Sequence, residues 1–116
     1  MFRLLFLLGL FFVSEASAEL KVSDDGDAML RHCKSALINT GQYTSEEGFC
    51  VGTVETLATF GQILPETYRF CPPRGVSHEV ILRVVVDYLE QRPEDRGSAL
   101  WQIADSAFQH AWPCTD

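Results

Sequence analysis

The sequence predicts an all-α fold, a small bundle of about four helices stapled by two disulfides and preceded by a signal peptide. Three observations support this prediction. The 116 residues suffice for one domain, apolar residues recur at helical spacing in separate segments, and four cysteines follow an apolar N-terminal run.

Residues 1–18 have the layout of a secretory signal peptide. Arg3 gives a positive start, an apolar run covers residues 4–13, and the small-residue pattern Ala16-Ser17-Ala18 ends the segment. The apolar run is much shorter than the roughly 20 residues that cross a bilayer. We therefore expect cleavage after Ala18 and a mature, exported domain over residues 19–116 that is not held in a membrane.

The net charge argues against a nucleic-acid partner. Arg3 and Glu15 cancel within the predicted signal peptide, so the mature chain keeps the formal charge of −7. Such a chain repels phosphate. Its charge suits solubility or a basic protein partner, and charge alone favours simple solubility.

The first predicted helix covers residues 28–38, where Met29, Cys33 and Leu37 share one face. Acidic residues at its N-terminal end interact favourably with the helix dipole. Thr44 and Glu47 form a capping-box pattern that begins a second helix, expected to reach about Leu64. Its predicted apolar face is Cys50, Val54, Leu57, Phe60 with Gly61, and Leu64. Glycine is costly in a helix, so the glycines at 48, 52 and 61 predict close helix–helix contacts.

The third predicted helix lies between Ser77, a good N-cap, and Pro93, a helix stop. Its β-branched residues would also suit a strand, but this length is ordinary for a helix and long for a strand. The fourth predicted helix covers residues 98–111. The predicted buried residues are Ile81, Val84, Val85 and Tyr88 in the third helix, and Leu100, Ile103, Ala104, Ala107, Phe108 and Ala111 in the fourth.

The four cysteines predict two disulfides, as is usual for a small exported domain. If consecutive helices pair antiparallel, Cys33 faces Cys50, and Cys71 and Cys114 fall at the same end of the second pair. A Cys50–Cys71 bridge would instead have to span about 20 Å of helix, whereas a disulfide needs Cα atoms within about 7 Å. We therefore predict the pairs Cys33–Cys50 and Cys71–Cys114.

Metal binding and catalysis find little support in the residues. His32, His78 and His110 could act as bases, and Glu55 or Asp87 could orient one of them. The chain, however, has no C-x-x-C pair, no H-E-x-x-H and no G-x-S-x-G motif. We expect no metal, no cofactor and no enzymatic activity.

Four strings in order resemble the Rap/Tai family of periplasmic immunity proteins of type VI secretion systems. They are GFCVGTV at 48–54, FCPPRGVS at 70–77, VVVDYLEQRPE at 84–94 and AWPC at 111–114. The resemblance implies a periplasmic protein that binds and blocks a secreted peptidoglycan amidase effector. Family members are often dimeric, which allows for a homodimer. The matched residues describe a scaffold, and a periplasmic chaperone-like helical module without a cognate toxin is the alternative.

A candidate contact surface for the partner is the connection 92–97. Arg92, Glu94, Asp95 and Arg96 cluster there between two predicted helices, and loops on a rigid scaffold often carry recognition. A solvated turn would explain the same charges.

Overall fold

A computed structural model describes residues 26–39 and 41–115. The predicted signal peptide, its cleavage site and the start of the mature chain lie outside these residues. None of the helices within the two described ranges is long and apolar enough to cross a membrane.

The described residues form four α-helices and no strand, which confirms the predicted all-α fold. The helices are α1 (Gly26–Ile38), α2 (Ser45–Phe60), α3 (His78–Gln91) and α4 (Leu100–Ala111). Short 3₁₀ turns connect them, namely η1 (Gly61–Ile63), η2 (Glu66–Tyr68) and η3 (Pro93–Asp95). Two boundaries differ from the prediction: α2 tightens into η1 before Leu64, and α4 begins after Ser98.

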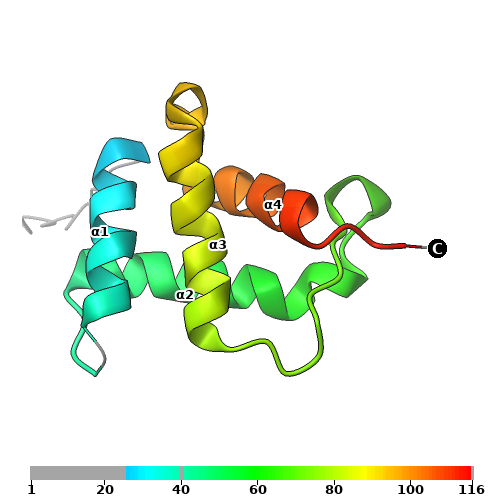
Figure 1. Ribbon diagram of the computed structural model, residues 1–116, viewed down its shortest axis with the longest axis horizontal. Helices are drawn as coiled ribbons and strands as arrows, with labels where there is room; N and C mark the ends of the chain where they lie inside the picture. The colour runs from blue at the N-terminus through cyan, green and yellow to red at the C-terminus, as the bar shows by residue number, and fades with distance from the viewer. Residues whose placement is uncertain (1–25, 40, 116) are drawn as a thin grey trace, which may run out of the picture.

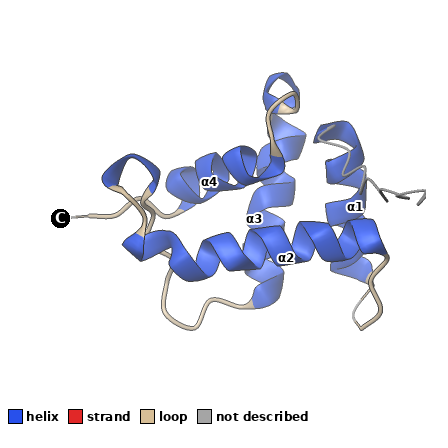
Figure 2. Cartoon of the chain, turned by 180° about the vertical axis from the view of Figure 1, so that it is seen from behind, coloured by secondary structure: helices blue, strands red, loops and turns tan. Residues whose placement is uncertain are grey.

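The helices form two crossed pairs. In Figure 1, α1 and α3 lie side by side and run in opposite directions, whereas α2 and α4 lie side by side and run in the same direction. Figure 2 shows from behind that one pair lies across the other. The prediction that consecutive helices pair antiparallel is therefore wrong. A short connection brings two helices into contact, but side-chain packing decides how they cross.

Both predicted disulfides are present. Cys33 and Cys50 meet where α1 crosses α2, with a Cα–Cα distance of 5.6 Å. Cys71 and Cys114 join the segment before α3 to the segment after α4 at 5.0 Å. Beside this second bridge, the Cys71 amide donates to the Trp112 carbonyl oxygen at 2.8 Å. The two loops span 17 and 43 residues, so they stabilise the fold by roughly 3 and 4 kcal/mol in the chain-entropy picture.

The core lies between the two pairs of helices. The predicted faces of α1 and α4 are largely confirmed, although Ala111 is exposed. In α3 the buried face lies one position away from the predicted one, because Ile81, Val84 and Tyr88 are only partly buried. Phe70 and Phe108 are fully buried and pack together with ring centroids 4.9 Å apart. The fully buried side chains larger than alanine are Cys33, Cys50, Val54, Phe70, Leu82, Val85, Leu89 and Phe108.

The buried carboxylate of Glu47 holds the N-terminal end of α2 to the end of α1. The predicted capping box is present: the Glu47 amide donates to Thr44 Oγ1 at 3.2 Å, and Glu47 Oε2 accepts from the Thr44 amide at 3.0 Å. Glu47 Oε1 accepts from Ser35 Oγ at 2.6 Å and from Asn39 Nδ2 at 3.1 Å. These donors, the Ser35 hydroxyl above all, hold the pKa of Glu47 below its usual value.

The prediction that the glycines of α2 mark close helix–helix contacts is wrong. A Cβ atom at Gly52 would meet nothing within 4 Å, and one at Gly48 would only reach Tyr43 at 4.0 Å. Gly61, which follows α2, does lie close to another part of the protein, but this is the aromatic ring of Phe70 and not a helix backbone. A Cβ atom there would come within 2.3 Å of the Phe70 ring, so this glycine leaves room for a central aromatic side chain.

Gly61→Ala should therefore lower the stability of the protein, whereas Gly52→Ala should not. The backbone of Gly61 is right-handed helical, so the cost of Gly61→Ala comes from displacing Phe70, roughly 1–3 kcal/mol. Gly52→Ala faces open space and should stabilise α2 by up to about 1 kcal/mol. Urea unfolding followed by circular dichroism measures both. Equal stabilities for the two variants would contradict the packing described here.

Replacing Glu47 by glutamine should lower stability at neutral pH and have little effect in acid. The folded state lowers the pKa of this carboxyl, so its contribution is present above the ordinary glutamate value of about 4.3 and is lost as the pH falls through the folded value. Urea midpoints between pH 3 and 7 should show the gap to wild type closing toward low pH. Glu46→Gln, on the same turn but exposed, is the control. A gap that does not depend on pH would contradict this role.

Candidate partner-binding surfaces

An apolar groove runs along the outer side of α2 and is closed on one side by Trp101 of α4. Its volume is about 640 Å³. The side chains of Phe60 and Trp101 are 49% and 48% exposed there. The lining residues are Gly48, Phe49, Gly52, Thr53, Thr56, Leu57, Phe60, Leu64 and Trp101.

Helix α2 is apolar on two sides, which explains why it has both a buried face and this groove. Cys50, Val54 and Ala58 point into the core. Residues on the other side alternate between large apolar ones, such as Phe49 and Phe60, and small ones. Because Gly52 has no side chain, nothing fills the space above the middle of the helix, and the larger residues become the walls of a hollow.

Contacts with the segment that contains η2 hold Trp101 in place. The rings of Tyr68 and Trp101 meet edge to face with centroids 6.4 Å apart. Two turns along α4, Gln109 Nε2 donates to the Thr67 carbonyl oxygen at 2.7 Å. The wall of the groove is therefore an indole that packs against Tyr68, and the Gln109–Thr67 hydrogen bond holds the η2 segment to α4. The sequence analysis did not single out Trp101.

The connection 92–97 contains the charged residues predicted to contact a partner, and the structure shows Arg96 making contacts within the protein. Its Nε donates to the Leu89 carbonyl oxygen at 2.9 Å, and its Nη1 lies 2.9 Å from Asp27 Oδ1. The Gly26 amide donates to the Arg96 carbonyl oxygen at 2.8 Å. Arg96 thus joins the end of α3 to the start of α1.

The other charged residues of this connection lie around Tyr88. The guanidinium of Arg92 lies over the Tyr88 ring, 4.9 Å from its centroid, and Asp95 Oδ2 accepts from the Tyr88 hydroxyl at 3.3 Å. Burial, followed by the nearby charge of Asp95, raises the pKa of Tyr88. Glu94 is exposed. Contact of this connection with a partner stays a prediction, with Glu94 as its most accessible charge.

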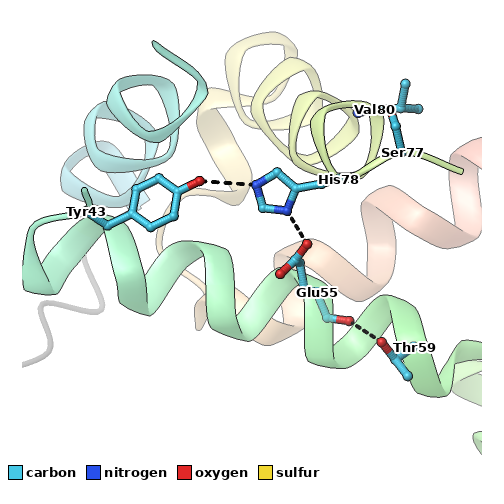
Figure 3. Close-up of polar contacts among 6 residues, drawn as sticks. All are labelled: Tyr43, Glu55, Thr59, Ser77, His78 and Val80. Carbon is cyan, nitrogen blue, oxygen red and sulfur yellow. Dashed lines mark hydrogen bonds and ion pairs between the residues drawn. The ribbon is translucent and has the colours of Figure 1, made fainter. Parts of the chain in front are cut away.

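A polar cluster of Tyr43, Glu55 and His78 lies on the surface between α2 and the start of α3, as Figure 3 shows. Of the acids considered as partners for a histidine, Glu55 is the one brought to His78. An ionised carboxylate only accepts hydrogen bonds, so the contact between His78 Nδ1 and Glu55 Oε1 places a proton on Nδ1. The Tyr43 hydroxyl lies 3.3 Å from Nε2.

This cluster connects the segment before α2, α2 itself and the start of α3. In a triad, the nucleophile would occupy the position at Nε2 that the Tyr43 phenol takes here. Within the described ranges, no group of three or more His, Cys, Asp or Glu side chains could hold a metal ion.

Asp105 is a buried carboxyl group that the sequence analysis did not single out. It is 5% exposed, and its Oδ1 has no hydrogen-bond partner among the described residues. Burial raises its pKa. Trp101, Asp105 and Gln109 recur every four residues and so follow one side of α4. A charge at this place lowers the stability of the fold.

Comparison with known proteins identifies the family. The family model of Rap1a immunity proteins matches residues 25–114, a range that includes all four α-helices and both disulfides. Searches of curated proteins and of solved structures gave no significant match. The match covers most of the 116 residues, and the chain therefore belongs to the family of Rap1a immunity proteins, which implies an immunity protein against a secreted effector.

Proposed function

We propose that this protein binds a peptidoglycan amidase delivered by a type VI secretion system and neutralises it in the periplasm. The observation that carries the proposal is the family match over residues 25–114. The amidase and the secretion system are suggested by the resemblance to the Rap/Tai family. We further propose that inhibition is stoichiometric and that the protein performs no chemistry itself, which is supported by the match to a family of immunity proteins.

The arrangement of the helices suits an inhibitor that acts by binding. A surface that must become ordered on binding loses affinity, so a rigid one is favoured. The Cys33–Cys50 bridge and the Glu47 hydrogen bonds attach α1 to α2, and Arg96 attaches α1 to the end of α3. These cross-links hold the outer faces of the helices in fixed positions.

Two features support action in the periplasm. Disulfides persist in oxidising compartments, and both pairs are formed in the structure. Residues 1–18 also have the pattern of a signal peptide. The amidase substrate, peptidoglycan, would lie in the same compartment.

The amidase encoded by the adjacent gene should bind this protein in a tight stoichiometric complex. Periplasmic co-expression should restore growth to cells that the amidase alone lyses, and calorimetry should give a defined ratio of the two chains. Intact masses of both proteins should be unchanged after incubation, because neither is modified. If no such amidase binds and the protein suppresses aggregation of unrelated periplasmic proteins, the chaperone-like alternative replaces immunity.

The protein isolated from the periplasm should begin at Glu19. A small-residue pattern at 16–18 directs cleavage after Ala18. Intact-mass analysis of the periplasmic fraction measures the N-terminus directly. Replacing Ala16 and Ala18 by bulky residues is the control and should block processing. Recovery of the chain with Met1 in the membrane fraction would contradict the predicted export.

A further inference from the structure

We propose that the apolar groove between α2 and Trp101 receives an apolar segment of the effector that is flanked by lysine or arginine. This proposal rests on the proposed function and assigns it a surface. The sequence pointed instead to the connection 92–97. In the structure, however, Arg96, Arg92 and Asp95 are engaged within the protein.

The apolar character of the groove indicates what it would bind. Phe60 and Trp101 each expose about half of their surface beside an open floor at Gly52. A protruding apolar side chain could enter above the glycine and contact aromatic rings on both sides. Aromatic residues that line a hollow in this way are the usual centres of binding energy in protein interfaces.

The charge around the groove indicates which partner fits. Helices α2 and α4 contain neither lysine nor arginine, and of their four acids Glu46 and Glu55 reach the surface while Glu47 and Asp105 are buried. Helices α1 and α3 instead mix both signs, with ion pairs Lys34–Glu90 and Arg83–Glu79. The exposed charged side chains of α2, which forms the floor of the groove, are therefore negative, and they favour a basic partner.

Exposed acids stand near both ends of the groove. Glu46 lies one helical turn before Phe49, and Glu66 begins η2 two residues after Leu64. Arg69, three residues after Glu66, also lies at this end of the groove, where its Nε donates to the Leu64 carbonyl oxygen at 3.2 Å. The Leu64 end thus carries both signs of charge, whereas Glu46 marks the other end. A segment with a cation at the Glu46 end would meet this carboxylate while its apolar centre covers the groove.

A second copy of the chain is a poorer occupant. Each copy has a formal charge of −7, and Glu46 and Glu66 are exposed near the ends of the groove. Two such faces brought together would place like charges opposite each other, which opposes association. The same charges favour a cationic partner.

Calorimetry and stopped-flow binding of the adjacent-gene amidase to purified variants test this assignment. Trp101→Ala and Phe60→Ala should each weaken the complex by about 30-fold or more, as expected of central contacts. Glu46→Lys and Glu66→Lys should slow association several-fold at low salt, with little difference at high salt. Val80→Ala and Glu79→Lys, at exposed positions of α3, are the matched controls and should bind like wild type. Circular dichroism confirms that each variant is folded.

The outcomes separate the two proposals. If the wild-type chain does not bind the amidase, the proposed function fails and this assignment fails with it. If wild type binds and the folded Trp101 and Phe60 variants bind equally well, only the groove assignment is overturned. Weakening by Glu94→Lys alone would place the contact on the connection 92–97. If sedimentation shows a dimer that Trp101→Ala dissociates without loss of amidase binding, the groove is a self-association surface and the proposal is wrong.

Discussion

The position of the outer face of α2 depends on the disulfide between Cys33 and Cys50. Both side chains are fully buried where α1 crosses α2, so the bridge acts in the core and not at a loop. One covalent link fixes a crossing point but leaves the helices free to rotate about it. The Glu47 carboxylate, three residues before Cys50, makes a second attachment through Ser35 and Asn39. Two attachments fix the direction in which α2 runs, and with it the side that faces outward.

Local signals in the sequence predicted most helix boundaries, because capping depends on a few neighbouring residues. The Thr44–Glu47 box and the Ser77 cap are examples. The disulfide pairs were also predicted, although from an antiparallel arrangement that the structure does not have. The pairing survives this error because a crossing brings two mid-helix cysteines together at many angles. The length of a connection does not predict the crossing angle between the two helices it joins, because that angle depends on side-chain packing along the whole contact.

The sequence analysis did not predict the groove, although one part of the groove could have been predicted from the spacing of the glycines. Gly48 and Gly52 each stand two residues from Cys50, about 200° around a helix at 100° per residue. A buried Cys50 therefore places both glycines on the outer side, where they open a hollow and do not admit a neighbouring helix. The wall formed by Trp101 could not be predicted from sequence spacing. Trp101 reaches the groove because α4 packs beside α2 and η2 orients the indole, and neither contact has a local signature.

An exposed apolar groove is a risk for a free protein, because such surfaces associate with each other. Here helix α2, which forms the floor of the groove, exposes Glu46 and has neither lysine nor arginine, and the whole chain has a formal charge of −7. The charge opposes self-association without covering the apolar surface, so the groove stays accessible. A basic partner reverses the sign of this effect, since the same carboxylates then attract it. One arrangement of charge thus disfavours a second copy and favours a cationic protein, which is the selectivity that an immunity protein requires while it waits for its effector.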